Sequence, residues 1–113
     1  MFKKICIIGC GLIGSSLARA VKKNNLAEKI VSSNRSDAVN KKVIELKIVD
    51  ESSSDTKKMV DGSDLVVIAT PLSSYKDVIS KIKNSLKDGV ILTDVGSVKE
   101  NIINLVEKNI PEN

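Results

Sequence analysis

Residues 4–14 read Lys-Ile-Cys-Ile-Ile-Gly-Cys-Gly-Leu-Ile-Gly, a short apolar run that leads directly into three spaced glycines. The run is rich in β-branched residues, which is typical of a buried strand. Ile13, Leu17 and Val21 then recur every four residues, the spacing that places side chains on one face of a helix. The glycines therefore lie between a strand and a helix over residues 12–23, and this context makes the Gly-x-Gly-x-x-Gly pattern informative.

The alternation of strand and helix continues along the chain. Strands are expected at residues 4–8, 29–33, 48–49, 65–69 and 90–93, and helices at 12–23, 37–46, 56–60, 75–86 and 98–106. Parallel neighbours need a long connection, which a helix supplies with a right-handed crossover. The pattern predicts one α/β domain over residues 1–113, a Rossmann-type doubly wound parallel sheet in the order 3-2-1-4-5 with helices on both faces.

The composition excludes several kinds of chemistry. The 113 residues carry 18 Lys+Arg and 14 Asp+Glu, a net charge of +4, and no histidine. Histidine bases and histidine-ligated metals are therefore excluded within these residues, and we expect no metal site. Aromatic residues are too few for stacked nucleic-acid binding. Two cysteines are too few for a disulfide framework, and no apolar run approaches the roughly 18 residues of a membrane helix, so a cytoplasmic location is expected.

Each glycine of the loop has an expected role. Gly9 permits a tight turn, Gly11 lets the backbone approach a pyrophosphate, and Gly14 lets the helix pack close to the strand. The backbone N–H groups of Leu12 and Ile13, at the positive end of the helix dipole, would then face the phosphates. The sequence therefore predicts a dinucleotide site, although a glycine turn that binds nothing remains the alternative.

The ribose position follows the second expected strand, about 20 residues after the last glycine. It reads Asn34-Arg35-Ser36, where an NAD site would place a carboxylate. Asn34 would not repel a 2′-phosphate, Arg35 could pair with it, and Ser36 could donate a hydrogen bond to it. NADP is therefore predicted over NAD, although Arg35 could also be an exposed loop charge.

Two further segments end strands at the same edge of the sheet. Ala69-Thr70-Pro71 follows the fourth strand, and Thr70 could donate a hydrogen bond to the ribose beside the nicotinamide. The alternative for Thr70 is a capped turn. In the second segment, after the fifth strand, Gly96 permits a sharp turn, and Ser97 is placed either as a helix N-cap or at the active site.

Three stretches together resemble a known family. Ile5 to Ala18, then Ala69-Thr-Pro71, then Thr93-Asp-Val-Gly-Ser-Val-Lys99 are similar to the nucleotide-binding domain of prephenate/arogenate (cyclohexadienyl) dehydrogenases, oxidoreductases of tyrosine biosynthesis. The resemblance covers essentially the whole chain, and the block at residues 93–99 is its most specific part. It implies oxidative decarboxylation of prephenate or arogenate, with the hydride transferred to the nicotinamide.

The resemblance also assigns roles that the residues alone do not. The serine matching Ser97 would lie at the active site and bind a catalytic histidine, which takes the proton of the substrate hydroxyl. That histidine and the helical domain that closes the substrate site and forms a homodimer are not among these residues. The family mostly uses NAD, from which Asn34-Arg35-Ser36 departs. We therefore expect this chain alone to bind cofactor without turnover.

Two other functions are compatible with a Rossmann-type domain. One is a stand-alone dinucleotide sensor without catalysis, against which the block at residues 93–99 argues. The other is a site for S-adenosylmethionine, against which the three glycines argue because that ligand has no pyrophosphate. The sequence does not distinguish prephenate from arogenate.

Overall fold

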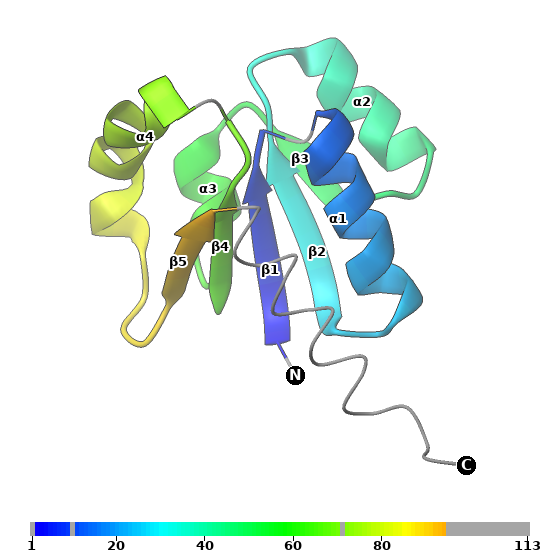
Figure 1. The fold of residues 1–113 in the computed structure, drawn as a ribbon, viewed down its shortest axis with the longest axis horizontal. Coiled ribbons are helices and arrows are strands. Elements are labelled where there is room, and N and C mark those ends of the chain that lie inside the picture. The colour runs from blue at the N-terminus through cyan, green and yellow to red at the C-terminus, as the bar shows by residue number, and fades with distance from the viewer. Residues whose placement is uncertain (1, 10, 71, 95–113) are drawn as a thin grey trace.

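β1 (Phe2–Ile8) lies at the centre of a parallel sheet whose strand order is β3-β2-β1-β4-β5. The computed structural model describes residues 2–9, 11–70 and 72–94, and Figure 1 shows the five strands pointing the same way. The other strands are β2 (Ala27–Ser33), β3 (Glu51–Ser53), β4 (Leu65–Ile68) and β5 (Ile91–Asp94). The predicted fold class and strand order are therefore confirmed.

The register brings the carboxyl ends of the three central strands to one level. Ile8, at the end of β1, is aligned with Ser33 of β2 and Ile68 of β4. The backbone N–H of Gly9 donates to the carbonyl of Ser33 at 2.8 Å, and that of Ala69 donates to the carbonyl of Ile8 at 2.8 Å. Because the turns after these strands start side by side, groups on different turns can contact one ligand.

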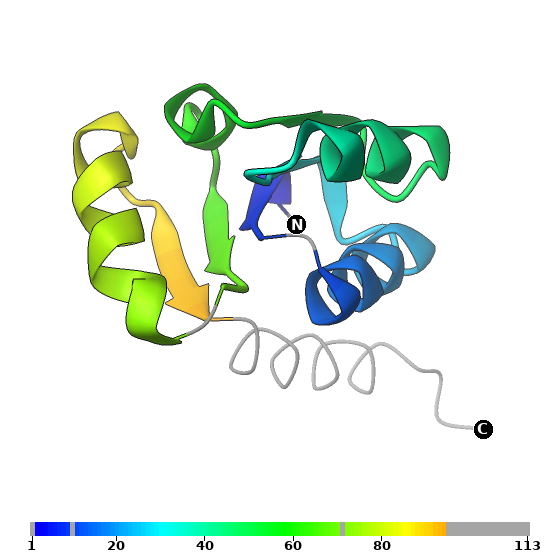
Figure 2. The ribbon, with the colours of Figure 1, turned by 90° about the horizontal axis from the view of Figure 1, so that it is seen from above.

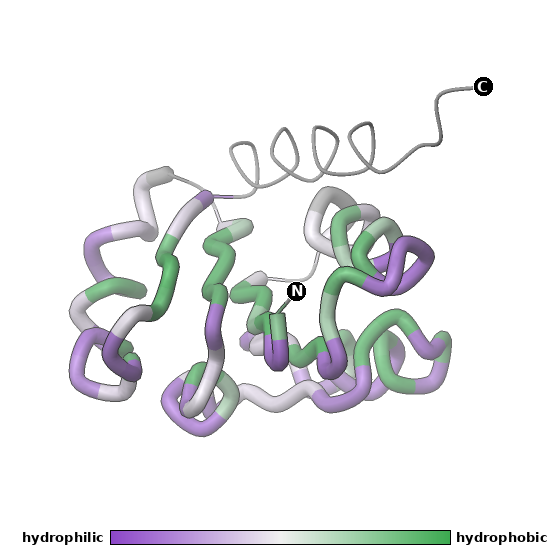
Figure 3. Tube along the Cα trace, turned by 90° about the horizontal axis from the view of Figure 1, so that it is seen from below, coloured by the Kyte–Doolittle hydropathy of each residue, from purple (hydrophilic) through white to green (hydrophobic). Residues whose placement is uncertain are grey.

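Helices cover both faces of the sheet in the described part of the chain. They are α1 (Leu12–Lys23), α2 (Asp37–Glu45), α3 (Thr56–Val60) and α4 (Tyr75–Ile82). Alternate side chains of β1 enter two apolar clusters, one with residues of α1 and α2 and the other with residues of α3 and α4. Figure 2 shows α1 and α3 on opposite sides of the sheet, and Figure 3 shows hydrophobic strands between hydrophilic outer turns.

Helix α1 begins and ends at the predicted residues. Its sequence contains apolar residues at helical spacing and two asparagines that end the helix. Leu17 and Val21 are buried at the expected spacing of four. At its end Asn24 donates its side-chain amide to the carbonyl of Ala20 at 2.8 Å, and Asn25 adopts a positive φ of 53° that stops the helix.

The third strand was predicted at the wrong residues. β3 begins at Glu51, and its residues pair with Val31, Ser32 and Ser33 of β2. Ile48 and Val49, predicted as that strand, lie in the connection before it, and both side chains are buried. Ile48 and Val49 fill the core after α2, whereas the short polar strand β3 is held in the sheet by backbone pairing with β2. The hydrophobicity of residues 48–49 therefore predicted their burial correctly but not the position of the strand.

The apolar residues at helical spacing in α2 and α4 are only partly buried. In α2 Val43 is buried and Val39 is exposed, and Leu46, the C-cap, is exposed as well. In α4, Ile82 is buried, but Ile79 is exposed, and residues 83–85 form a 3₁₀ turn where continuation of the helix was predicted. Both helices cover outer parts of the sheet, so a narrower stripe of each reaches the core. The helix predicted over residues 98–106 lies outside the described residues.

Asp64, the residue before β4, connects the amino end of β4 to that of β1 through hydrogen bonds. Its carboxylate accepts hydrogen bonds from the backbone N–H groups of Lys3 at 2.6 Å and Lys4 at 3.2 Å, and it pairs with Lys87. The hydrogen bond from Lys87 and those from the two backbone N–H groups lower the pKa of Asp64 to about 2. Asp64 thus satisfies two backbone N–H groups at this end of the sheet with a side chain of the protein itself.

Cys6 belongs to the apolar core on the α3 and α4 side of the sheet. It is fully buried, and burial raises the pKa of its thiol to about 12. Among the described residues, no helix has the length and apolar character needed to cross a membrane.

Candidate functional site

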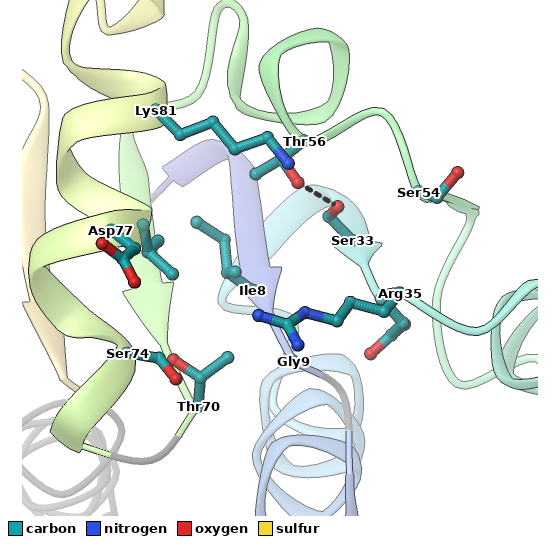
Figure 4. Close-up of a pocket in the computed structure, with 12 residues that line it drawn as sticks. Ile8, Gly9, Ser33, Arg35, Ser54, Thr56, Thr70, Ser74, Asp77 and Lys81 are labelled. Carbon is teal, nitrogen blue, oxygen red and sulfur yellow. Dashed lines mark hydrogen bonds between the residues drawn. The ribbon is translucent and has the colours of Figure 1, made fainter.

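A cavity of about 490 Å³ lies at the carboxyl ends of β1, β2 and β4 (Figure 4). Its walls come from the turns that follow these strands, from the start of α3 and from one face of α4. The lining residues are Ile8, Gly9, Ser33, Asn34, Arg35, Ser54, Thr56, Thr70, Ser74, Asp77, Val78 and Lys81. Six described residues with predicted roles are not part of this lining: Gly11, Leu12, Ile13 and Gly14 at the start of α1, Ser36 at the start of α2, and Ala69 directly after β4.

Gly9 forms a turn that a larger residue could not form. Its φ is +86°, and a Cβ atom added there would lie 2.7 Å from Thr70 Cγ2. Its carbonyl accepts a hydrogen bond from the backbone N–H of Gly11 at 3.0 Å, which closes the turn. The glycine therefore keeps the β1–α1 turn close to the turn that follows β4.

Gly14 and Gly11 lack a side chain for opposite reasons. A Cβ atom on Gly14 would lie 2.8 Å from the carbonyl oxygen of Gly9, so this buried glycine lets α1 pack against the preceding turn. Such a close approach of helix and strand is the role predicted for Gly14. Among the described residues, nothing would lie within 4 Å of a Cβ atom on Gly11. No contact in the described part of the chain therefore requires glycine at position 11, which supports a ligand approaching there.

The start of α1 carries no acidic residue in its first turn. Its N-cap is Gly11, which has no side chain to cap the helix, and no capping hydrogen bond is found there within the described residues. Its last turn carries Lys22 and Lys23, which complement the negative end of the helix dipole. The N–H groups of the first turn and the positive end of the dipole thus favour an anion beside Gly9.

The turn after β4 contributes an unsatisfied hydroxyl. Thr70 lines the cavity, and its Oγ1 atom is buried and has no hydrogen-bond partner among the described residues. Tyr75 holds the start of α4 against this turn, because its hydroxyl donates to the carbonyl of Ile68 at 3.4 Å. Burial raises the pKa of Tyr75. A buried hydroxyl without a partner is costly, so Thr70 is a candidate ligand contact.

The three residues at the predicted ribose position differ in what their side chains do. Asn34 donates its side-chain amide to Asn40 Oδ1 at 2.9 Å, and Ser36 Oγ caps α2 by accepting from the backbone N–H of Val39 at 3.3 Å. Arg35 is exposed and forms no ion pair with any carboxylate of the described residues. Figure 4 shows its guanidinium reaching over the cavity toward Gly9. Of the three, Arg35 is the most available to a ligand.

The sequence analysis missed one wall of the cavity. This wall consists of Ser74, the N-cap of α4, and of Asp77, Val78 and Lys81 within that helix; their spacings of three, one and three place them on one helix face. The same spacing could have indicated this face, but the apolar residues at positions 75, 79, 82 and 86 gave a stronger signal. Lys81 extends across the cavity toward Thr56 (Figure 4).

Two hydroxyl groups at the cavity wall were also missed. Ser33 Oγ and Thr56 Oγ1 lie 2.8 Å apart and share a hydrogen bond. The charged residues of the lining are Arg35, Lys81 and Asp77, two cations against one anion. This excess of positive charge favours a ligand that carries negative charge.

Three predicted site residues cannot be placed. Pro71, Gly96 and Ser97 lie outside the described residues, so their roles remain predictions. Ala69 lies between β4 and Thr70 and packs against the apolar core on the α1 side. Its expected contribution is therefore limited to the backbone of the turn.

Comparison with known proteins identifies relatives over most of the chain. The sequence model of the family described as "Prephenate dehydrogenase, nucleotide-binding domain" matches residues 17–113. A prephenate dehydrogenase of Lactococcus lactis is 35% identical over 107 residues, which are 94% of this chain and 30% of that protein. A cyclohexadienyl dehydrogenase of Zymomonas mobilis is 35% identical over 111 residues, which are 98% of this chain and 38% of that protein.

Solved structures share the fold. The crystal structure of prephenate dehydrogenase from A. aeolicus, in complex with hydroxyphenyl propionate and NAD⁺, superposes with a TM-score of 0.77 at 20% identity. The match covers 91% of this chain and 39% of that chain. At this identity the likeness shows the fold alone. The chain spans between 30% and 38% of the length of the two curated relatives described above.

Proposed function

The chain belongs to the family of prephenate dehydrogenase nucleotide-binding domains, and we propose that it binds a nicotinamide dinucleotide and prefers NADP to NAD. The observation that carries the proposal is the open start of α1, where, among the residues that the structure describes, no side chain caps the helix and none lies within 4 Å of a Cβ atom placed on Gly11. An anionic ligand satisfies the N–H groups that a capping side chain would otherwise satisfy.

The described residues fit such a cofactor. Gly9 and Gly14 shape the turn, and the backbone at Gly11, Leu12 and Ile13 would bind the pyrophosphate. Thr70, whose buried hydroxyl has no partner within the described ranges, would donate to the ligand from the opposite side. When bound, the cofactor supplies the hydride acceptor of the reaction.

The preference for NADP rests on Arg35. The residue lines the cavity, reaches toward the glycine turn and is not neutralised by a carboxylate of the described residues. A guanidinium binds a phosphate through paired, charge-assisted hydrogen bonds. The oxygen of Ser36 accepts a hydrogen bond from the backbone N–H of Val39, and its O–H group would remain to donate to the phosphate.

For the whole protein we propose oxidative decarboxylation of prephenate or arogenate in tyrosine biosynthesis, by a cytoplasmic homodimer. This part of the proposal rests on family membership and on the names of the relatives. Gly96 and Ser97 would lie at the substrate, as the resemblance implies. Because the 113 residues contain no histidine, the family's proton acceptor would come from outside them, and these residues alone would bind cofactor without turnover.

Calorimetric titration of the chain with NADP⁺ and NAD⁺ at equal ionic strength tests the cofactor assignment. The proposal predicts binding of both and a lower Kd for NADP⁺. A lower Kd for NAD⁺ would contradict the role of Arg35 and leave the dinucleotide site standing. Absence of binding by either cofactor would contradict the site itself.

A further inference from the structure

A network of buried and partly buried polar residues joins three elements next to the cavity: the end of β2, the start of α2, and β3. Asn40 is its centre: its Oδ1 accepts from Asn34 Nδ2 at 2.9 Å and from Ser52 Oγ at 2.6 Å, and its Nδ2 donates to the carbonyl of Asn34 at 3.0 Å. Ser52 Oγ also lies 2.7 Å from Ser32 Oγ. Both the side chain and the backbone of Asn34 are therefore held by one residue of the next helix.

The orientation of both amides follows from the network itself. A backbone carbonyl can only accept, so the atom of Asn40 that faces the carbonyl of Asn34 must be the nitrogen. The other end of the Asn40 amide is then an oxygen, and it requires a donor from Asn34. Asn34 thus directs its NH₂ group toward Asn40.

The burial of Asn40 makes the network specific. Asn40 has 4% of its surface exposed, and Ser32 is fully buried. A buried amide that lost these partners would have no water to replace them, so the amide pair restricts the conformation of the turn that carries Arg35.

We infer that Asn40 is a positioning residue for cofactor recognition: through its paired hydrogen bonds with Asn34 it fixes the β2–α2 turn so that Arg35, rather than Asn34, meets the 2′ substituent of the adenosine ribose. The inference rests on the proposed function. Asn40 itself does not line the cavity, and Arg35 does. The amide pair keeps the NH₂ group of Asn34 on Asn40 and leaves the guanidinium as the group that distinguishes a phosphate from a hydroxyl.

The test compares 2′,5′-ADP with 5′-AMP, two probes that differ only in the 2′-phosphate. Asn40→Ala removes the three hydrogen bonds of the Asn40 amide, and Asn40→Asp keeps the size and the acceptor but places an oxygen against the Asn34 carbonyl. Ser63→Ala is the matched control, because Ser63 is buried, bonds only weakly to the carbonyl of Met59 at 3.4 Å and lies outside the cavity. Calorimetry of each variant gives both Kd values, and thermal unfolding shows that it is folded.

In both Asn40 variants the Kd for 2′,5′-ADP should rise about tenfold, the loss of roughly one charge-assisted hydrogen bond, while the Kd for 5′-AMP stays within about twofold. Ser63→Ala should leave the ratio of the two Kd values unchanged. An unchanged ratio in Asn40→Ala and Asn40→Asp, or an equal loss of both probes, would overturn the inference, because a merely structural asparagine weakens both probes alike.

A measurement without ligand separates this inference from the proposed function. In the ¹H–¹⁵N NMR spectrum, Asn40→Asp should shift or broaden the backbone amides of Arg35 and Ser36, and Ser63→Ala should not. If the wild-type chain binds neither probe, the proposed function fails. The amide signals then still decide whether Asn40 holds the turn: unchanged signals in Asn40→Asp overturn the inference.

Discussion

The two ends of the sheet differ in how their polar groups are bonded. At the amino end, Asp64 accepts hydrogen bonds from the backbone N–H groups of Lys3 and Lys4 and pairs with Lys87. At the carboxyl end, within the described part of the chain, α1 starts without a side-chain cap and Thr70 Oγ1 has no hydrogen-bond partner. Parallel strands place the two ends on opposite sides of the molecule. At the amino end Asp64 satisfies strand N–H groups within the protein, whereas at the carboxyl end the first N–H groups of α1 and Thr70 Oγ1 are candidates for contact with a ligand. The comparison distinguishes residues that stabilise the fold, such as Asp64, from residues that are candidates for binding, such as Gly11 and Thr70.

The largest expected effect comes from placing a side chain on Gly14. In Gly14→Ser the new Cβ atom would lie 2.8 Å from the backbone oxygen of Gly9, an atom that cannot turn aside. Crowding of this kind costs about 1–3 kcal/mol of unfolding free energy. Chemical denaturation followed by circular dichroism measures the loss. A wild-type unfolding midpoint would show that α1 does not need this close approach.

Removal of the Arg35 charge should act on binding and not on folding. Arg35→Ala should raise the Kd for NADP⁺ roughly tenfold and leave the Kd for NAD⁺ nearly unchanged, because only the 2′-phosphate loses a partner. Lys41→Ala removes a charge of the same sign from the exposed side of α2, outside the cavity, and serves as the control. If the two variants weakened NADP⁺ equally, general electrostatic attraction would explain the preference.

Introduction of a carboxylate at position 34 should not turn the site into one for NAD. In Asn34→Asp an acceptor would face Asn40 Oδ1, and turning the Asn40 amide would place its oxygen against the carbonyl of residue 34. We expect a loss of about 1–3 kcal/mol of stability and no gain in NAD⁺ affinity. Calorimetry together with denaturation measures both quantities. A tighter NAD⁺ complex at unchanged stability would mean that residue 34 reads the ribose directly.

The smallest effect is expected at the amino end, and it depends on pH. The folded-state pKa of Asp64 is lowered from 3.8 to about 2, so its stabilising contribution is present above pH 3.8 and is lost as the pH falls through about 2. Asp64→Asn should therefore lower the melting temperature at neutral pH and flatten its decline between pH 4 and pH 2. The neighbouring variant Asp61→Asn should keep the wild-type decline. An equal decline in Asp64→Asn would show that other carboxylates govern this pH range.

The sequence predicted the parts of the fold that depend on local signals. The strand before Gly9 and the helix over residues 12–23 follow from periodicity and glycine spacing, and the structure contains both of them. The third strand was misplaced because Glu51–Ser53 is specified by pairing with β2, a contact that no local pattern displays.

The residues of the candidate site that directly follow strands could be predicted from the sequence. The contacts between segments that are distant in the sequence could not. The glycines, Arg35 and Thr70 were found because each follows a strand at a position where ligands bind in this type of sheet. The α4 wall and the pairing of Asn34 with Asn40 were not found, because they depend on how a helix is set against the sheet. Asn34 was expected to face a ligand, and only the three-dimensional structure shows its amide engaged by Asn40.

The central claim, that the open start of α1 binds the cofactor phosphates, is tested most directly by titrating Gly11→Ser with NADP⁺ beside the wild-type chain. Serine is a favoured N-cap, and no described residue would lie within 4 Å of its Cβ atom at position 11, so the variant should keep its stability within about 0.5 kcal/mol. Its side chain would occupy the N–H groups that the phosphates need. The account predicts that NADP⁺ binds the wild type and that its affinity for Gly11→Ser falls at least about tenfold, the value of one hydrogen bond to a charged group. Equal binding by the two folded proteins would contradict it.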